Sequence, residues 1–250
     1  MLNTFTYIII FFIGALFTSF FHLIVDRFYD KKTILGKSEC PSCHKELKLI
    51  DVIPFLGYLI NKGSCRYCKA NIPKSHIIFE AIGGLLTLLG FVSFSFSIEY
   101  LIYLILISVL LIESISDLKK FLVIDRVWLI AMPILIMLQI MNQSFLTHLL
   151  SSSVIFIILL IFATIASKVL KKEALGGGDI KLYIFIGWAL TLQEVFFSLF
   201  LAAFFGLLYA IIKKRTQQEL PFVPFIFIGS AISILYGQQL IDLYLNWLGV

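Results

Sequence analysis

Residues 100–141 read YLIYLILISVLLIESISDLKKFLVIDRVWLIAMPILIMLQIM, two apolar runs on either side of a short charged connection. The runs, 100–116 and 122–141, approach the roughly 20 apolar residues that a helix needs to cross the hydrocarbon core of a bilayer. The connection between them contains Asp117 and two lysines. Because charged side chains are costly inside a membrane, this pattern predicts two membrane-spanning helices that are joined at the membrane surface.

The same pattern extends over the rest of the chain. Of its 250 residues, 60% are hydrophobic and 14% are charged, against roughly 25% charged residues in an average soluble domain. A soluble fold of this length cannot bury so much apolar surface, and a disordered chain would carry far less of it. The predicted fold class is an all-α polytopic membrane protein with about eight transmembrane helices. The hydrophobic segments are 5–25, 77–96, 100–116, 122–141, 148–167, 180–193, 195–212 and 220–241.

Basic residues occur in every second connection between these segments, and the remaining connections contain no Lys or Arg. The positive-inside rule places the basic connections in the cytoplasm, so we expect both termini outside. The first segment lacks a basic start and a small-residue cleavage site, and is expected to stay as an uncleaved anchor. The basic connections are 27–74, then Lys119, Lys120 and Arg126, then Lys168, Lys171, Lys172 and Lys181, then Lys213, Lys214 and Arg215.

One segment, 26–76, differs from the rest in charge. It holds 10 of the 20 Lys and Arg residues and 5 of the 15 Asp and Glu residues, so that its net charge equals the +5 of the whole chain. We therefore predict a first transmembrane helix (1–25), a cytoplasmic insertion (26–76) and a membrane domain (77–250). The basic residues lack the interleaved aromatics of a nucleic-acid surface, so no nucleic-acid partner is expected.

The four cysteines lie in this insertion as two CxxC pairs, Cys40 with Cys43 and Cys65 with Cys68. Two such pairs match the tetrahedral thiolate coordination of zinc, and four thiolates leave no open position for a catalytic water. A cytoplasmic location disfavours disulfides. The sequence therefore predicts a structural Zn²⁺ that stabilises a loop with few aliphatic residues. The alternatives are two redox dithiols or plain thiols.

Acidic residues at the ends of the membrane segments are candidates for function, because they are expensive there. Asp117 and Asp179 both end or begin a segment on the predicted cytoplasmic side, and Asp179 follows three glycines that leave its carboxylate uncovered. Two carboxylates that share a proton can activate a water for peptide hydrolysis. Glu80 and Glu113 are further candidates to line such a site.

Asp117 and the run Gly176-Gly177-Gly178-Asp179-Ile180-Lys181 resemble the type IV prepilin peptidase family, which is marked by a GxGDxK signature and an earlier aspartate at a helix end. The likeness extends over most of the chain. It includes the two cysteine pairs, Asp51 to Pro54, Phe79-Glu80 and the proline segment 221–225. The sequence departs from the family at Val123-Ile124-Asp125, where a proline is usual.

The resemblance implies an aspartic endopeptidase that removes the leader from prepilins or pseudopilins at the cytoplasmic face of the bacterial inner membrane. Asp117 and Asp179 would be catalytic, and Gly176, Gly178 and Lys181 would complete the motif. It also implies that S-adenosylmethionine serves as methyl donor for the new N-terminus. Membrane lipids would surround the helices, and the sequence assigns no oligomeric state.

Two other functions are compatible with the residues alone. A proton-coupled transporter could use Asp117 and Asp179 as a relay, since a glycine-flanked acid at a broken helix suits transport. A membrane scaffold could instead bind partners through the zinc loop.

Overall fold

The hydrophobic segments fold into helices, and the described residues contain isolated β-bridges but no extended strand. The computed structural model describes residues 4–33, 36–171, 175–213 and 220–248. Lys172, Lys214 and Arg215 of the predicted basic connections lie outside these residues. The helices are α1 (Thr4–Tyr29), α2 (Leu49–Val52), α3 (Leu56–Ile60), α4 (Ser75–Phe94), α5 (Ile98–Lys120), α6 (Asp125–Met141), α7 (Phe145–Leu170), α8 (Gly177–Gly187), α9 (Leu192–Ile212) and α10 (Val223–Leu248).

The predicted polytopic helical class is confirmed. Each of the eight hydrophobic segments forms a helix, and six of these helices in the described part of the chain are long and apolar enough to cross a membrane: α1, α4, α5, α7, α9 and α10. The other two are shorter, with 17 residues in α6 and 11 in α8. Pro133 lies inside α6.

The chain forms two compact units, Met1–Phe96 and Ser97–Val250. In the first unit, α1 packs along α4 through small residues on both helices. A Cβ built on Gly83 would overlap Thr18 Oγ1, and one built on Gly14 would lie 2.5 Å from Thr87 Cβ. Small residues at such a crossing let membrane helices approach closely. Because α4 packs on α1, the unit extends to the end of α4, beyond residue 76, where the sequence placed the end of the insertion.

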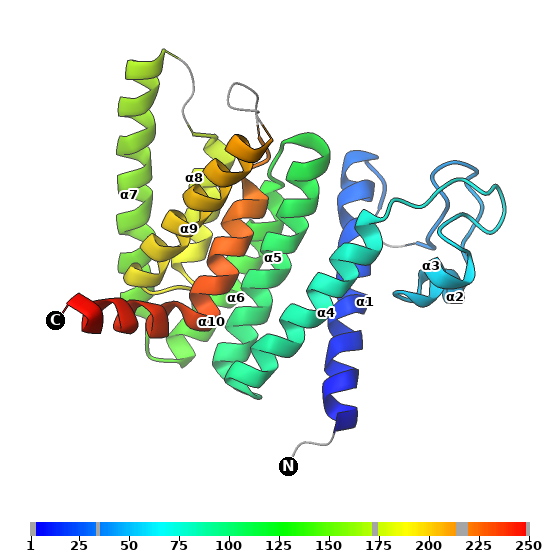
Figure 1. The fold of residues 1–250 in the computed structure, drawn as a ribbon, viewed down its shortest axis with the longest axis horizontal. Helices are drawn as coiled ribbons and strands as arrows, with labels where there is room; N and C mark the ends of the chain where they lie inside the picture. The colour runs from blue at the N-terminus through cyan, green and yellow to red at the C-terminus, as the bar shows by residue number, and fades with distance from the viewer. Residues whose placement is uncertain (1–3, 34–35, 172–174, 214–219, 249–250) are drawn as a thin grey trace. The chain divides into compact units, whose positions relative to one another are not determined.

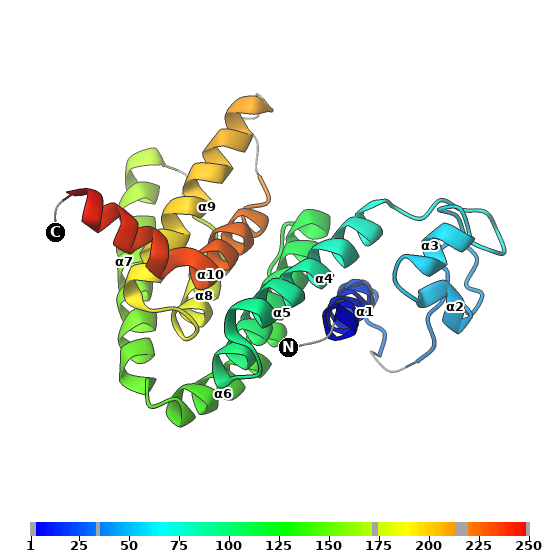
Figure 2. The same cartoon turned by 60° about the horizontal axis from the view of Figure 1, so that its bottom comes forward.

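The six helices of the second unit alternate in direction (Figures 1 and 2), so that α5, α7 and α9 end where α6, α8 and α10 begin. Within this bundle α10 packs against α5 and α9, and α7 packs against α8 and α9. The arrangement collects residues from distant parts of the chain at one end of the bundle. That end contains the last turn of α5 and the first turns of α6, α8 and α10.

The short helix α8 ends among buried residues, where the carbonyl groups of its last turn and of the segment that follows need hydrogen-bond partners. Buried side chains of α6 and α7 supply these partners. Ser152 donates to the carbonyl of Ile184 at 2.8 Å, and Gln139 donates to the carbonyl of Trp188 at 2.8 Å. The imidazole of His148 lies 3.1 Å from the carbonyl of Leu190. A half-length helix is therefore stable in this position.

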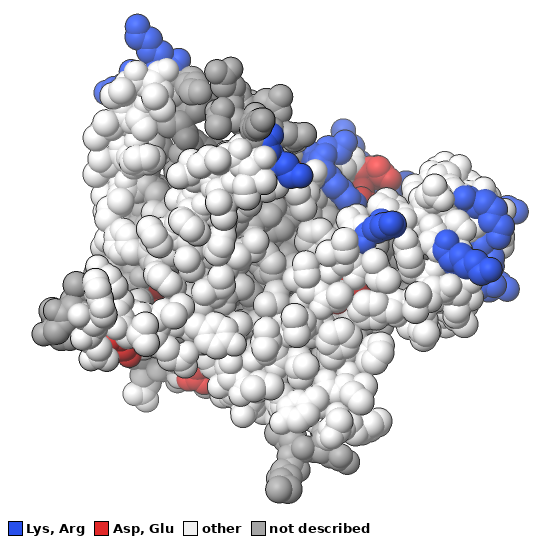
Figure 3. Space-filling view, in the orientation of Figure 1, with Lys and Arg blue, Asp and Glu red and all other residues white. Residues whose placement is uncertain are grey.

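Charge is distributed unevenly along the second unit. Lys119 and Lys120 lie in the last turn of α5, and Lys168 lies in the last turn of α7. The Lys and Arg side chains of this unit that are visible in Figure 3 lie at the end of the bundle where α5 and α7 end. Glu99 and Glu194 lie in the first turns of α5 and α9, at the opposite end.

Candidate functional site

The four cysteines lie in two turns of the same conformation, one around each CxxC pair. In each turn the N–H of the first cysteine donates to the carbonyl five residues later, from Cys40 to Lys45 at 3.0 Å and from Cys65 to Ala70 at 2.8 Å. An antiparallel β-bridge closes each turn. One local structure thus occurs twice, and the repeated CxxC spacing is its signal in the sequence.

The two turns bring the four thiols together into one group that can hold a metal ion. All four sulfur atoms lie within 4.8 Å of one another, and Cys40 Sγ is 3.8 Å from Cys68 Sγ. A tetrahedral site with Zn–S bonds of about 2.3 Å has sulfur–sulfur edges of about 3.8 Å. The thiols therefore fit a four-sulfur metal site.

An ion pair braces the loop that carries these turns. Arg66 donates to Asp51 from Nη2 at 2.7 Å and from Nε at 3.0 Å, and Asn61 donates to the same carboxylate at 2.8 Å. The Asp51 side chain is 4% exposed. The hydrogen bond from Arg66 is the main cause that lowers the pKa of Asp51 to about 2. Asp51 thus links α2 to the second cysteine turn.

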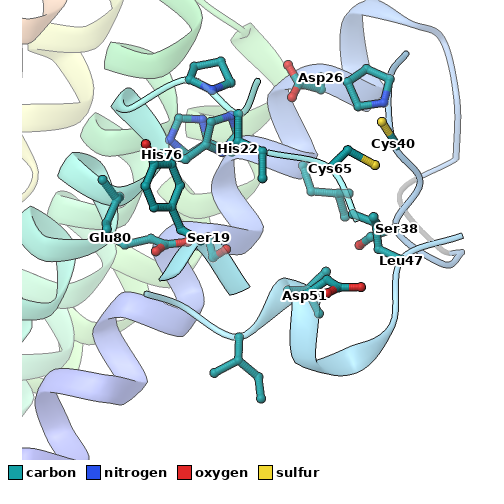
Figure 4. A pocket seen from close by; sticks show the side chains of 18 of the residues that line it. Ser19, His22, Asp26, Ser38, Cys40, Leu47, Asp51, Cys65, His76 and Glu80 are labelled. Carbon is teal, nitrogen blue, oxygen red and sulfur yellow. The ribbon is translucent and has the colours of Figure 1, made fainter. Parts of the chain in front are cut away.

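The first unit also contains a half-open cavity of about 530 Å³ between α1, α4 and the cysteine loop. Figure 4 shows Glu80 on its wall, together with the stacked rings of His22 and His76, whose centroids are 4.1 Å apart. Glu80 accepts a hydrogen bond from the Phe55 N–H at 3.0 Å. Cys40 and Cys65 form part of the same wall. The predicted candidate Glu80 therefore lies in the cavity of the first unit.

Asp117 lies in the last turn of α5 in the second unit and is 7% exposed. Its Oδ2 accepts a hydrogen bond from the N–H of Val223 at 2.9 Å, and Val223 is the first residue of α10. Helix N-termini present unpaired N–H groups and a partial positive charge, so they orient a carboxylate. The proline segment 221–225 thus contributes a backbone donor to Asp117.

Asp179 lies in the first turn of α8, at the same end of the bundle as the last turn of α5, which carries Asp117. The glycines before it differ in their surroundings. A Cβ on Gly176 would lie 3.1 Å from Asp179 Oδ2, and one on Gly178 would lie 2.7 Å from Val123 Cγ2. A Cβ on Gly177 would have no neighbour within 4 Å. The two glycines of the GxGD signature are therefore constrained by close contacts, and the glycine between them is not.

Lys181, which the sequence placed in the motif, follows Asp179 by two residues and bonds a residue of α6. Its Nζ donates to Asp125 Oδ2 at 2.7 Å, and both side chains are about half exposed. It therefore joins the first turns of α6 and α8. Sequence reasoning left open whether Lys181 orients Asp179, and the bond to Asp125 gives it a different partner.

Glu113, one turn before Asp117, is completely buried and accepts a hydrogen bond from the N–H of Ile124 at 2.7 Å.

The sequence did not indicate the roles of Val123 and Val223, because their contacts join segments far apart in the chain. The only signal in the sequence was the departure at Val123-Ile124-Asp125 and the position of residue 223 within the proline segment.

Fold and sites together define the class: a polytopic helical membrane protein with a carboxylate pair in one compact unit and a four-cysteine group in the other. Two family models match the chain, the "Bacterial Peptidase A24 N-terminal domain" over residues 12–94 and the "Type IV leader peptidase family" over residues 104–211. The chain belongs to the type IV leader peptidase family, as the resemblance of its sequence motifs to that family predicted.

Curated relatives support this membership. A "Type 4 prepilin-like proteins leader peptide-processing enzyme" of Escherichia coli is 34% identical over 82% of this chain and 77% of the relative. A "Prepilin leader peptidase/N-methyltransferase" of Bacillus subtilis is 29% identical over 95% of this chain and 97% of the relative. A protein of the same name from Pseudomonas aeruginosa is 28% identical over 86% of this chain and 77% of the relative. No solved structure matches the chain.

Proposed function

We propose that this protein is a membrane aspartic endopeptidase that cuts the leader from type IV prepilins or pseudopilins. The observation that carries the proposal is geometric: the last turn of α5, with Asp117, and the first turn of α8, with Asp179, lie at the same end of the bundle, and Val123 lies against Gly178 between them. Membership of a leader peptidase family supports it. Of the two rivals, neither the transporter nor the scaffold accounts for that membership.

The chemistry follows from two carboxyl groups that share one proton. The ionised group takes a proton from a water, which attacks the scissile carbonyl carbon. The protonated group donates its proton to the carbonyl oxygen. The group that took the proton from water then gives it to the leaving amine as the C–N bond breaks, and the other group takes a proton back from the tetrahedral intermediate. Each group thereby acts once as an acid and once as a base in every cycle, and the N–H of Val223 holds the carboxylate of Asp117 in orientation.

The test is mass spectrometry of a prepilin co-expressed with the protein. We expect a product shortened by its leader, and no shortening with Asp117→Asn or Asp179→Asn, because an amide cannot exchange the proton. Glu99→Gln is the matched control, since Glu99 lies on the same helix as Asp117 but in its first turn. Cleavage by Asp179→Asn at the wild-type rate would reject the proposal.

The metal of the four-cysteine group is proposed to be Zn²⁺ with a structural role. Zinc suits four thiolates with the spacing found here, and such a site has no open position for substrate. Cys40, Cys43, Cys65 and Cys68 would hold it. Metal analysis of purified protein should give about one zinc per chain.

Methylation of the new N-terminus is proposed from the names of the relatives. The cavity of the first unit has the volume of pockets that take small-molecule cofactors, and its wall offers carboxylates and aromatic rings to a cationic ligand with an apolar base. S-adenosylmethionine, when bound, supplies the methyl group. Asp26, Phe55 and Glu80 are the residues proposed to hold it.

Binding of S-adenosylmethionine can be measured without turnover by equilibrium dialysis. Glu80→Gln should weaken binding, because it removes a negative charge from the wall, and should leave leader cleavage intact. Equal binding by Glu80→Gln and wild type would place the cofactor elsewhere.

The protein is proposed to lie in the bacterial inner membrane, surrounded by lipid, with both termini outside and the basic end of the second unit in the cytoplasm. An introduced cysteine at Asn142, between α6 and α7, should react with an impermeant reagent added from outside. One introduced at Lys171, after α7, should not. The reverse pattern would invert the topology.

A further inference from the structure

The connection between α5 and α6, residues 121–124, is tied to the last turns of α5 at three points. Glu113 accepts a hydrogen bond from the N–H of Ile124 at 2.7 Å. The hydroxyl of Ser116 donates to the carbonyl of Leu122. The N–H of Phe121, whose φ is 55°, donates to the carbonyl of Asp117 at 2.9 Å. The connection therefore follows the position of α5.

The other side of this connection touches α8. A Cβ on Gly178 would lie 2.7 Å from Val123 Cγ2, so the valine side chain lies directly on the glycine backbone. Gly178 immediately precedes Asp179. Lys181, two residues after Asp179, bonds Asp125, the first residue after the connection. The connection thus lies between the segments that carry Asp117 and Asp179 and contacts both.

Glu113 is the most deeply buried of these anchors. Its side chain is 0% exposed, and its second oxygen, Oε1, has no hydrogen-bond partner among the described residues. A buried carboxyl group with one unsatisfied oxygen costs free energy. A residue that served only to fill space at this position would be apolar. Its retention here is explained by the hydrogen bond to Ile124.

We propose that Glu113 is a positioning residue that sets the separation of Asp117 and Asp179, by holding residues 121–124 as a spacer between α5 and α8. The inference rests on the proposed peptidase function. Charged groups near Glu113 come from α5 and α6, namely Asp117 and Asp125. Asp125 is paired with Lys181 of α8.

The spacer predicts a signature in the pH dependence of cleavage. Two close carboxyl groups lose their protons at well-separated pH values, because the first negative charge opposes the second. The active, singly protonated pair then exists over a wide pH range. If the spacer loosens and the groups move apart, the two titrations converge and the bell-shaped profile of kcat narrows.

The experiment compares Glu113→Gln with Glu113→Leu in purified full-length protein, with a leader-bearing peptide as substrate. Glutamine keeps an oxygen that accepts from Ile124, so its kcat and the width of its profile should stay within about threefold of wild type. Leucine has similar volume but no acceptor. It should lower kcat about 10- to 100-fold with little change in KM, and narrow the profile. Ser116→Ala removes the hydrogen bond to Leu122 in the same connection. It should lower kcat and narrow the profile less than Glu113→Leu does.

The outcomes separate positioning from other roles. If Glu113→Leu lowers kcat by the same factor at every pH and leaves the width of the pH profile unchanged, the effect is loss of folded protein alone. That result would overturn the inference. A Glu113→Gln defect equal to that of leucine would assign the effect to charge or proton transfer, and would also overturn it. If Asp179→Asn still cleaves, the proposed function itself fails. If Asp179→Asn is inactive and Glu113→Leu is normal, only this inference fails.

Discussion

The four-cysteine group is built from short local turns, whereas the carboxylate pair is built from helices that lie far apart in the chain. Each half of the cysteine group forms within a single turn, closed by a hydrogen bond between residues five apart. The carboxylate pair needs α5, α8 and α10, which meet only when the bundle is complete. Loss of a single ligand should therefore be enough to release the metal from the cysteine group. At the carboxylate pair, small displacements of the helix ends should be enough to reduce leader cleavage.

The largest effect in the comparison is expected from loss of a metal ligand. Cys43→Ser should release zinc and unfold the cysteine loop, because a structural zinc contributes about 10–16 kcal/mol of binding free energy to folding. Metal analysis and limited proteolysis of the loop measure this. Cleavage of the leader should persist, whereas binding of S-adenosylmethionine should fall, since Cys40 and Cys65 form part of the cavity wall.

The control for this variant is Ser42→Ala, an exposed residue between the first two cysteines. It should keep zinc and protease resistance. A Cys43→Ser protein with full zinc content, or one that loses leader cleavage along with the metal, would contradict the independence of the two sites.

The next effect concerns the contact between α8 and the spacer. Gly178→Ala puts a methyl group 2.7 Å from Val123 Cγ2, so α8 or the spacer must move. A displacement on this scale is expected to lower kcat for leader cleavage about 10- to 100-fold. Gly177→Ala is the matched control, because its Cβ meets nothing within 4 Å, and its activity should stay near wild type.

Adding Val123→Ala to Gly178→Ala makes room for the methyl group and should recover part of the lost activity. No recovery, together with an equal loss for Gly177→Ala, would show that the glycines act through backbone freedom and not through this contact.

A smaller effect is expected from the ion pair in the cysteine loop. Asp51→Asn removes a buried charged acceptor and should destabilise the loop by about 1.5–3 kcal/mol. The measurement is the denaturant dependence of proteolysis in the loop, in the zinc-bound protein. Glu46→Gln, in an exposed pair with Lys37, is the control and should leave stability nearly unchanged.

The pH dependence of the Asp51 contribution follows from its pKa. Folding lowers the pKa of Asp51 from 3.8 to about 2, so the fold favours the ionised form. The stabilisation is therefore complete above pH about 4 and is lost as the pH falls toward about 2. The difference between wild type and Asp51→Asn should be constant from pH about 5 to 8. A difference that changes across this neutral range would assign the effect to another group.

The smallest effect should come from Lys181. Its bond to Asp125 is half exposed, and such pairs contribute about 0.2–1 kcal/mol. Lys181→Ala should therefore reduce leader cleavage only a few-fold, and Asp125→Ala should do the same. Because the two residues act through one bond, the double variant should be no worse than either single variant. Additive losses would mean that Lys181 acts on another group, such as Asp179.

The sequence predicted local features of both regions well. Cys40, Cys43, Cys65 and Cys68 form the expected group, because the signal for each turn lies within a few residues. The number and order of the hydrophobic segments predicted the helices, because apolar length decides insertion.

Contacts between distant segments could not be predicted in this way. Nothing local indicates that Val223 donates to Asp117, or that Val123 lies on Gly178, since both contacts depend on how the helices pack. The early end of α8 depends likewise on Gln139 and other buried partners in neighbouring helices. The expectation that glycines merely uncover Asp179 was incomplete, because it did not include the contacts that constrain Gly176 and Gly178.

The most direct test of the account is cleavage of a synthetic leader-bearing peptide by the purified protein in detergent. The rates of wild type, Asp117→Asn, Asp179→Asn, the double variant and Glu99→Gln are compared. We expect wild type and Glu99→Gln to shorten the peptide. Both single variants should be inactive, and the double variant no worse than either, because the two groups act as one unit. Shortening of the peptide by Asp179→Asn at a rate near that of wild type would contradict it.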